Sequence, residues 1–310
     1  MKVYVAGHNG LVGRALTRAI EAKPDLEWIG ATRSELDLLD SGAVQSFLEK
    51  KSPDLILMAA AKVGGIGAND KYPVEFLLDN LTIQNNIMKS AHEVGIKKLV
   101  FLGSSCIYPK FCKQPIKEEY LLTGELEPTN DAYAIAKIAG IKLIQSYRKE
   151  YGHSWISVMP TNLYGPDDNF NPETSHVLPA MIAKFHKAKL AEDPHVILWG
   201  SGKPRREFLH VEDLADAILM LAMSYNDASP INIGSGHDLE IRELATLISN
   251  IVGYPGEIKW NTDMPDGTPR KLLDISKISS LGWQPKISLE DGIKRVYDSY
   301  RESLVANNSK

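Results

Sequence analysis

The sequence has little cysteine, no long apolar run and no excess of basic charge, and each absence excludes a class of protein. The 310 residues include only two cysteines, Cys106 and Cys112, which lie in one short segment with Pro109 between them. Such a pair is poor evidence for a structural disulfide, and no metal-ligand pattern accompanies it. We therefore expect no bound metal and at least one thiol that is free for chemistry.

Membranes and nucleic acids are excluded as partners on similar grounds. No apolar stretch approaches the roughly 18–20 residues that a membrane-spanning helix needs. A strand is expected at 3–6, which leaves no space for a signal peptide, so we expect a cytoplasmic protein. The formal net charge of −4 provides no long-range basic field for nucleic acid or an anionic membrane. With 44% hydrophobic residues, the chain can bury one large core or two unequal ones.

Strand and helix patterns alternate along about the first 160 residues, which predicts an α/β fold with a Rossmann-type, doubly wound parallel sheet. The expected strands are 3–6, 27–31, 54–61, 98–102 and 155–159, and the expected helices are 11–22, 73–94 and 130–151. After a polar loop at 167–174 the alternation breaks down. The later segments are a helix at 177–189, a strand at 196–199, a basic turn at 200–210, a helix at 211–223 and a strand at 229–233. The segment 238–252, a Pro/Gly-rich connection around 266–271 and a final helix at 289–303 follow.

Two domains follow from this pattern. We expect residues 1–164 and about 207–234 to form an NADP-binding domain. A smaller, discontinuous α/β domain, which would bind the substrate, is expected from about 165–206 and from 235–310.

Three glycines follow the first strand. Gly7 permits a tight turn, Gly10 lets a pyrophosphate approach, and Gly13 lets the next helix pack on the strand. This order of strand, turn and helix directs backbone N–H groups and the positive end of a helix dipole toward an anion. Glycines also end strands for purely structural reasons, but the flanking strand and helix favour cofactor binding. The predicted contacts here are Gly7, His8, Asn9, Gly10, Leu11, Val12 and Gly13.

The second strand is followed by Thr32, Arg33 and Ser34, and not by the acidic residue that would bind a ribose 2′-hydroxyl. An acidic residue would repel a 2′-phosphate, whereas Arg33 can form a charge-assisted contact with it. The alternative is that Arg33 is a solvated turn residue. We predict NADP(H) as the cofactor in preference to NAD.

Tyr133 and Lys137 are four residues apart in a predicted helix and therefore share a face. The ammonium can lower the pKa of the phenol from about 10 toward neutrality. Such a tyrosine can exchange a proton with a carbonyl or alcohol oxygen, and Ser104 can share the hydrogen bond to that oxygen. Taken separately, the Tyr/Lys pair is equally consistent with exposed surface residues. Ser104 and Ser105 could also simply satisfy the terminal carbonyls of a strand.

The later part of the chain offers weaker signals. Lys203, Arg205 and Arg206 in an otherwise acidic protein suggest a diphosphate site, although an ordinary charged turn has the same composition. The segment 160–166 follows a strand and could meet the nicotinamide. For a lone loop histidine such as His176, the default role is capping or exposure to solvent.

Read together, these features resemble the extended short-chain dehydrogenases/reductases that act on nucleotide sugars. The features that carry the resemblance are Gly7-x-x-Gly10-x-x-Gly13, Ser104, Tyr133-x-x-x-Lys137 and the segment 206–211. The resemblance is narrower than the whole family and points to its epimerase-reductases. This narrower match rests on the stretches 59–66, 102–109, 160–166, 175–179 and 266–271. Essentially the whole chain is covered.

The resemblance implies an NADPH-dependent conversion of GDP-4-keto-6-deoxy-D-mannose to GDP-L-fucose in a homodimer, with helices 73–94 and 130–151 at the interface. C3 and C5 would be epimerised before hydride reduces the C4 ketone. Ser104, Tyr133 and Lys137 would be the reductase triad, and Cys106 and His176 the epimerisation pair, in which either could be the acid. Further cofactor contacts would be Leu102, Gly103, Lys137, Pro160, Asn162, Leu163 and His176. Substrate contacts would be Ser105, Asn162, Lys184, Trp199, Arg206, Asp266 and Lys271.

At two positions the sequence departs from the family pattern, and two other classes of protein are alternatives to this function. Lys184 and Asn9 stand where family members often have Arg, which could weaken contacts with phosphate and with the adenosine half of the cofactor. A nucleotide-sugar 4-epimerase, dehydratase or reductase would use the same Tyr/Lys pair without needing Cys106 or His176. A non-catalytic NADP-binding protein would have no need to retain Tyr133 and Lys137.

Overall fold

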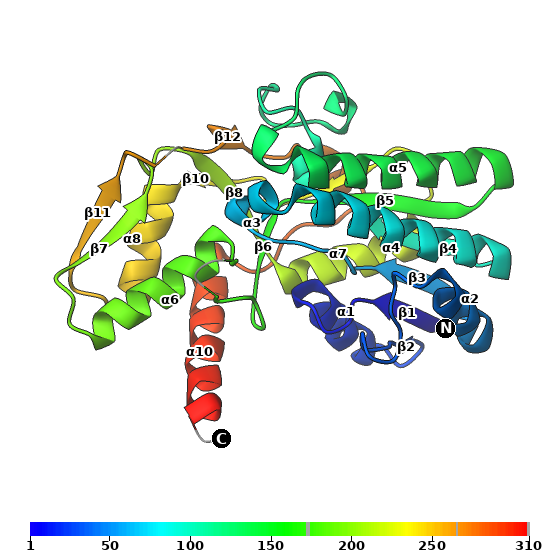
Figure 1. Ribbon diagram of the computed structural model, residues 1–310, viewed down its shortest axis with the longest axis horizontal. Helices are drawn as coiled ribbons and strands as arrows, with labels where there is room; N and C mark the ends of the chain where they lie inside the picture. Colours follow the sequence, from blue (N-terminus) through cyan, green and yellow to red (C-terminus); the bar gives the residue numbers. More distant parts are fainter. Residues whose placement is uncertain (172–173, 265, 309–310) are drawn as a thin grey trace.

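The structure is a computed structural model that describes residues 1–171, 174–264 and 266–308. Its central layer is a six-stranded sheet with the strand order β2-β1-β3-β4-β5-β9, in which every pair is parallel (Figure 1). The strands are β1 (Lys2–Ala6), β2 (Glu27–Ile29), β3 (Leu55–Met58), β4 (Lys98–Leu102), β5 (Ser154–Pro160) and β9 (Ile231–Ile233). The strand order reverses between β1 and β3, which is where doubly wound folds bind ligands. The predicted Rossmann-type fold is confirmed.

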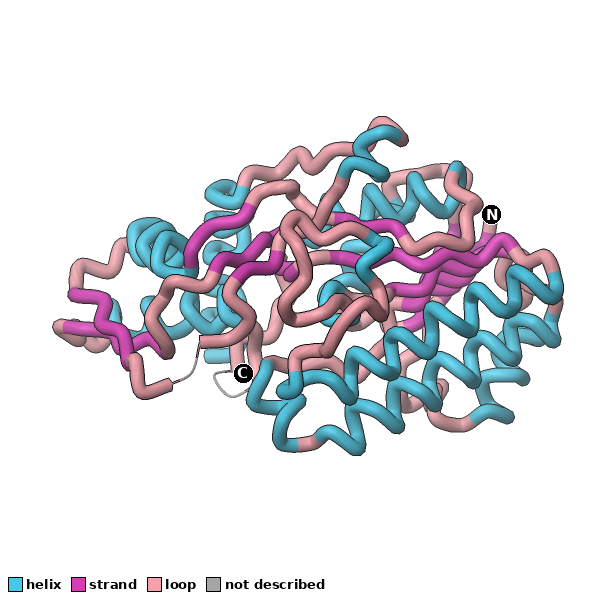
Figure 2. Tube along the Cα trace, turned by 90° about the horizontal axis from the view of Figure 1, so that it is seen from above, coloured by secondary structure: helices cyan, strands magenta, loops and turns pink. Residues whose placement is uncertain are grey.

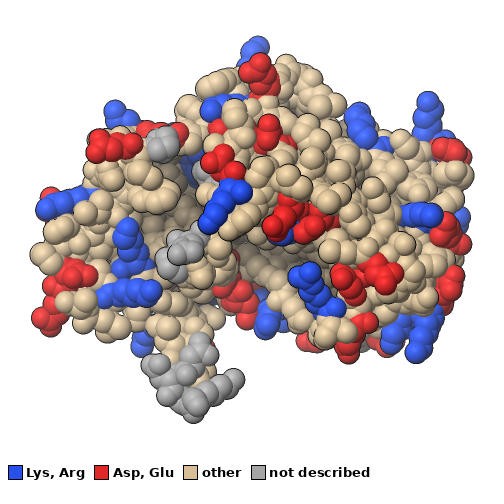
Figure 3. Space-filling model, viewed as in Figure 1, with Lys and Arg blue, Asp and Glu red and all other residues tan. Residues whose placement is uncertain are grey.

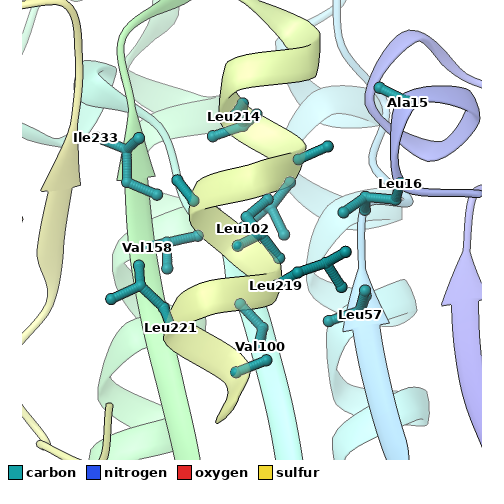
Figure 4. Packing of buried hydrophobic residues seen from close by; sticks show 14 of the residues in the cluster. Ala15, Leu16, Leu57, Val100, Leu102, Val158, Leu214, Leu219, Leu221 and Ile233 are labelled. Atoms are coloured by element: carbon teal, nitrogen blue, oxygen red, sulfur yellow. The ribbon is translucent and has the colours of Figure 1, made fainter. Parts of the chain in front are cut away.

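Helices cover both faces of this sheet. One face carries α2 (Ser41–Lys51), α4 (Pro73–Val94) and α5 (Asp131–Tyr151), and the other carries α1 (Leu11–Glu21) and α7 (Val211–Ser224). Successive strand residues point to opposite faces. In β4, Val100 and Leu102 therefore pack against α7 (Figure 4), whereas Leu99 and Phe101 belong to the core beneath α4 and α5.

A third core lies beyond the end of the six-stranded sheet, among α6 (Val177–Leu190), α8 (Ile241–Val252) and α10 (Leu289–Asn308). Here β8 (Arg205–His210) pairs with β6 (Asn162–Tyr164), β10 (Asp238–Glu240) and β12 (Arg270–Lys271), and β7 (His195–Trp199) pairs with β11 (Glu257–Asn261). In the view of Figure 2, β7 and β11 lie at the far end from the N-terminus, and the strands around β8 lie between them and the six-stranded sheet. The division into two domains stays a prediction.

The structure differs from the prediction in several elements. The segment 200–210 is not only a turn, because its second half forms β8, whose partners come from three distant parts of the chain. Residues 238–240 form β10 before α8 begins. The short helices α3 (Ile66–Lys71) and α9 (Ser276–Ser280), and also α2, were not predicted. Of the loop predicted at 167–174, residues 172–173 lie outside the described residues.

The described helices include none that combines the length and the apolar character required to cross a membrane. Basic and acidic side chains are interspersed over the face drawn in Figure 3, which is hollowed between the α6/α8/α10 part and the six-stranded sheet.

Candidate active site

Lys137 lies on α5 and is buried, with 4% of its surface exposed. Its Nζ donates a hydrogen bond of 2.7 Å to the carbonyl oxygen of Leu102 at the end of β4. The same ammonium lies 4.9 Å from the ring centroid of Phe101 and 5.8 Å from that of Tyr133. Burial disfavours the charged form and lowers the pKa of Lys137 to about 8. The lysine is therefore close to its titration point near neutral pH.

Tyr133 is brought to Ser104 and Cys106, as the sequence predicts, but its pKa moves in the opposite direction. Desolvation is the main cause and raises the pKa of the phenol, the charge of Cys106 raises it further, and a hydrogen bond with the Ser104 side chain lowers it only in part. The predicted lowering of this pKa by Lys137 is wrong, because desolvation of the phenol outweighs the contribution that lowers it. Tyr133 is therefore protonated at neutral pH.

Cys106 lies in a 3₁₀ turn, Ser105–Ile107, that directly follows Ser104. The Ser104 hydroxyl accepts a hydrogen bond of 3.3 Å from the Cys106 backbone N–H. Two donors approach the thiol sulfur, namely Asn130 Nδ2 at 3.4 Å and Lys271 Nζ at 3.8 Å. Lys271 comes from β12, so two distant parts of the chain meet at this thiol. Ser105, the first residue of this turn, is itself buried.

Two of the predicted basic residues of segment 200–210, Arg205 and Arg206, lie in different environments. Arg206 is largely desolvated, which lowers its pKa, while the charges of Cys106, Glu127 and Asp266 raise it. Of the charges that raise the pKa of Arg206, that of Cys106 contributes most. Arg205 instead forms an ion pair of 3.2 Å with Asp238 of β10. Arg205 is therefore a structural residue and not part of a diphosphate site.

A second group of predicted substrate residues lies around β7. The Asp266 carboxylate accepts hydrogen bonds from the Ser201 N–H at 2.9 Å and from its hydroxyl at 2.6 Å. Lys184 on α6 donates to the Ile197 carbonyl oxygen. Trp199, at the end of β7, is 71% exposed. Trp199 is thus open to solvent, whereas the Lys184 ammonium and the Asp266 carboxylate already have protein partners.

His176 immediately precedes α6 and makes no capping hydrogen bond with its side chain. The residue is exposed, but neighbouring protein displaces part of its water, which lowers its pKa. Its segment is attached to the loop after β3, because the Gly65 N–H donates to the Thr174 carbonyl oxygen at 3.3 Å. Within the described residues, no contact joins His176 to Cys106.

The glycine turn after β1 fits a dinucleotide. Gly7 has φ +83°, and a Cβ on Gly13 would lie 2.1 Å from the Gly7 carbonyl oxygen. A Cβ on Gly10 would meet only that same oxygen at 3.5 Å, so the space above Gly10 is open. No side chain caps the N-terminus of α1. These free N–H groups and this open space are what a pyrophosphate requires.

The remaining predicted cofactor residues surround this turn. The His8 ring lies 5.6 Å from that of Trp28, the Asn9 carbonyl oxygen accepts from Arg14, and Leu11 and Val12 begin α1. Leu102 and Gly103 end β4, while Pro160, Asn162 and Leu163 follow at the ends of β5 and β6. The Asn162 amide is already engaged, since Nδ2 donates to the Glu207 carbonyl oxygen at 2.8 Å.

Arg33 is exposed and forms no ion pair within the part of the chain that the structure describes. A carboxylate that the sequence reasoning missed lies close by. Glu35 accepts hydrogen bonds from the Thr32 N–H at 2.7 Å and from the Thr32 hydroxyl at 2.8 Å, and these bonds lower its pKa. The Thr-x-x-Glu spacing was the available signal, because it is that of a capping box.

Residues 3–234 match the NAD dependent epimerase/dehydratase family, and the chain belongs to this family. Within it, the chain is similar over almost its whole length to GDP-L-fucose synthases. It is 54% identical to GDP-L-fucose synthase 1 from Arabidopsis thaliana, covering 98% of this chain and 94% of the relative. It is 50% identical to GDP-L-fucose synthase from Escherichia coli (strain K12), covering 97% of each.

Solved structures agree with this relationship. A GDP-6-OMe-4-keto-L-xylo-heptose reductase from C. jejuni superimposes with a TM-score of 0.93 at 38% identity, over 97% of this chain and 98% of that one. A GDP-L-fucose synthetase from Naegleria fowleri bound to NADP has a TM-score of 0.90 at 30% identity, over 98% and 95%.

Proposed function

We propose that this chain converts GDP-4-keto-6-deoxy-D-mannose to GDP-L-fucose, with epimerisation at C3 and C5 followed by NADPH-dependent reduction of C4. The observation that carries the proposal is that the Ser104 hydroxyl and Cys106 are adjacent, with the Cys106 N–H donating to Ser104 Oγ at 3.3 Å, and that both residues influence the pKa of Tyr133. A proton donor for a sugar oxygen and a thiol for a neighbouring carbon would therefore belong to one site. The relatives named GDP-L-fucose synthase at 50–54% identity support the same reaction.

The chemistry follows from the C4 ketone. The hydrogens on C3 and C5 are removable because the resulting carbanion delocalises onto the C4 oxygen, which Tyr133 and Ser104 would hold. Inversion requires proton removal from one face of the ring and proton return on the other, and Cys106 and His176 would supply these two steps. NADPH, when bound, supplies the hydride for C4. Tyr133, whose pKa is raised, would protonate the oxygen.

Each end of the site has its own binding task. Gly10 and the uncapped N-terminus of α1 would hold the cofactor pyrophosphate, and Arg33 the 2′-phosphate. Arg206 and Lys271 would bind the diphosphate of the substrate, while Lys184, Trp199 and Asp266 would contact its outer half. NADP(H) as the cofactor is supported by the structures that carry it in their descriptions.

A second candidate is reduction at C4 without epimerisation. It is favoured by two structural neighbours, a GDP-6-OMe-4-keto-L-xylo-heptose reductase with a TM-score of 0.93 and a GDP-mannoheptose C4 reductase with a TM-score of 0.90. The two donors on the Cys106 sulfur weigh against it, since a reductase has no use for a thiol in this position.

We further propose a cytoplasmic homodimer that associates through α4 and α5. Val74 and Leu78 on α4 and Ile135 on α5 are 71%, 59% and 47% exposed. Large apolar side chains grouped on two neighbouring helices are typical of an interface. The division into an NADP-binding and a substrate-binding domain belongs to the same proposal.

The test uses GDP-4-keto-6-deoxymannose and NADPH in deuterated water. We expect NADPH oxidation and deuterium at both C3 and C5 of the product. Cys106→Ser and His176→Ala should each slow this exchange by about 10²- to 10⁴-fold, the range for a positioned acid or base. Cys112→Ser is the matched control and should behave like the wild type. NADPH oxidation without deuterium at either carbon would support the C4 reductase instead, and exchange that survives both substitutions would refute the epimerisation pair.

A further inference from the structure

A small cavity lies next to the Cys106 thiol. Its volume is about 10 Å³, which is the space of one water molecule. Cys106, Lys110, Glu127, Thr268 and Lys271 contribute to its lining. Glu127 is the one carboxylate among the described lining residues, and Cys106 the one thiol. A water here would have several polar partners, as a buried water requires.

Glu127 lines this cavity and is also partly exposed to solvent. Its carboxylate accepts a hydrogen bond of 3.2 Å from the Thr268 hydroxyl and forms an ion pair of 3.0 Å with Lys110. The side chain of Glu127 is 15% exposed and that of Lys110 is 28% exposed. Burial raises the pKa of Glu127, but its contacts with Lys110 and Thr268 more than offset this, and the net pKa is lowered. The carboxylate is therefore ionised at neutral pH and releases quickly any proton that it accepts.

The proposed reaction needs such a path. If one thiol serves the inversion of both C3 and C5, it must return to its starting protonation state between the two inversions. The bound sugar covers the side of the thiol where the reaction occurs. The rate at which Cys106 returns to its starting protonation state therefore depends on a path for protons to solvent that does not pass through the substrate.

We propose that one water molecule in this cavity carries protons between Cys106 and Glu127, and that Glu127 passes them to solvent beside Lys110. When Cys106 has taken a proton from carbon, the S–H bond breaks as the water oxygen accepts that proton. The water at the same time gives one of its own protons to the Glu127 carboxylate. The thiolate and the water are restored, and Glu127 then loses its proton to solvent. The steps run in reverse if Cys106 donates to carbon. This inference rests on the proposed function.

Glu127→Gln tests the relay because the amide keeps the size of the side chain but cannot carry the proton. In deuterated water, we expect the first inversion within a single enzyme turnover to proceed at the wild-type rate. The second inversion should be slower by about tenfold or more, as for a lost proton-transfer group. Formate should restore the rate in proportion to its concentration. Glu125→Gln is the matched control, since it makes the same change at an exposed residue outside the cavity lining, and it should stay within about twofold of the wild type.

The outcomes separate the relay from the function. If the wild type does not convert the keto sugar, the proposed function fails. If the wild type is active and Glu127→Gln inverts both carbons at wild-type rates, only the relay is wrong. Slowing that formate does not restore, accompanied by a raised KM and a lower Tm, would mean a structural role and would also overturn it. If Glu127→Gln does not fold, a high-resolution crystal structure of the wild type decides, because absence of a water between Cys106 and Glu127 refutes the proposal.

Discussion

The buried ammonium of Lys137 should make the stability of this protein depend on pH in a specific way. The pKa of Lys137 falls from 10.5 to about 8 on folding. Between these values the unfolded chain binds more protons than the folded one, so stability rises with pH. The penalty of the buried charge is present in full below pH 8 and disappears as the pH approaches 10.5.

The size of this effect follows from the pKa difference. At pH 7 the buried charge costs about 3 kcal/mol, since each pKa unit is worth about 1.4 kcal/mol. At pH 9 the cost falls to about 2 kcal/mol, and at pH 10 to about 1 kcal/mol. Lys137→Met removes the charge but also leaves the Leu102 carbonyl oxygen without its 2.7 Å hydrogen bond. That second cost is the same at every pH and cancels when two pH values are compared.

The assay is denaturant unfolding of the wild type and Lys137→Met at pH 7, 9 and 10, at one protein concentration. Relative to the variant, the wild type should gain about 1 kcal/mol between pH 7 and 9 and about 2 to 3 kcal/mol between pH 7 and 10. A difference between the two proteins that stays constant over this range would show that the ammonium is not desolvated. The same pKa should produce an alkaline limb near pH 8 in kcat/KM for reduction.

Three further predictions concern the cofactor turn, the cofactor phosphate and the dimer. Gly13→Ala should destabilise the fold, because its Cβ would lie 2.1 Å from the Gly7 carbonyl oxygen. Gly10→Ala should fold normally but bind NADPH more weakly. Thermal unfolding measures the first effect, and fluorescence titration with NADPH measures the second. Arg33→Ala should raise KM for NADPH by about tenfold to a hundredfold, the equivalent of about 1.5–3 kcal/mol for a charge-assisted hydrogen bond, with little change for NADH. Equal effects on the two cofactors would place Arg33 away from the 2′-phosphate. Leu78→Glu should dissociate the dimer in light scattering, while Leu122→Glu, at a position 57% exposed outside α4 and α5, should not.

Local signals predicted the central sheet well. The helix at 73–94 and the strand at 98–102 have the predicted bounds, because Pro73 opens that helix, Gly95 ends it in the left-handed conformation, and β4 is continuously apolar. The doubly wound parallel sheet and the family were likewise predicted correctly.

Features that depend on distant partners were not predictable. The segment 205–210 was predicted as part of a basic turn, because the local sequence contains no signal that β6, β10 and β12 pair with it. The pKa of Tyr133 was predicted with the wrong sign because spacing along a helix gives no measure of desolvation. Asn130 and Glu127 were missed as neighbours of Cys106, since ordinary polar residues before a helix give no signal of a tertiary role.

The contact between Lys271 and Cys106 joins residues 165 positions apart. During synthesis the glycine turn, Ser104, Tyr133 and Lys137 all leave the ribosome before the ammonium that faces the thiol has been made. A chain shortened before β12 would retain every residue of the reductase triad and still lack part of the surroundings of Cys106. The surroundings of the thiol are therefore completed later in synthesis than the Ser104, Tyr133 and Lys137 group.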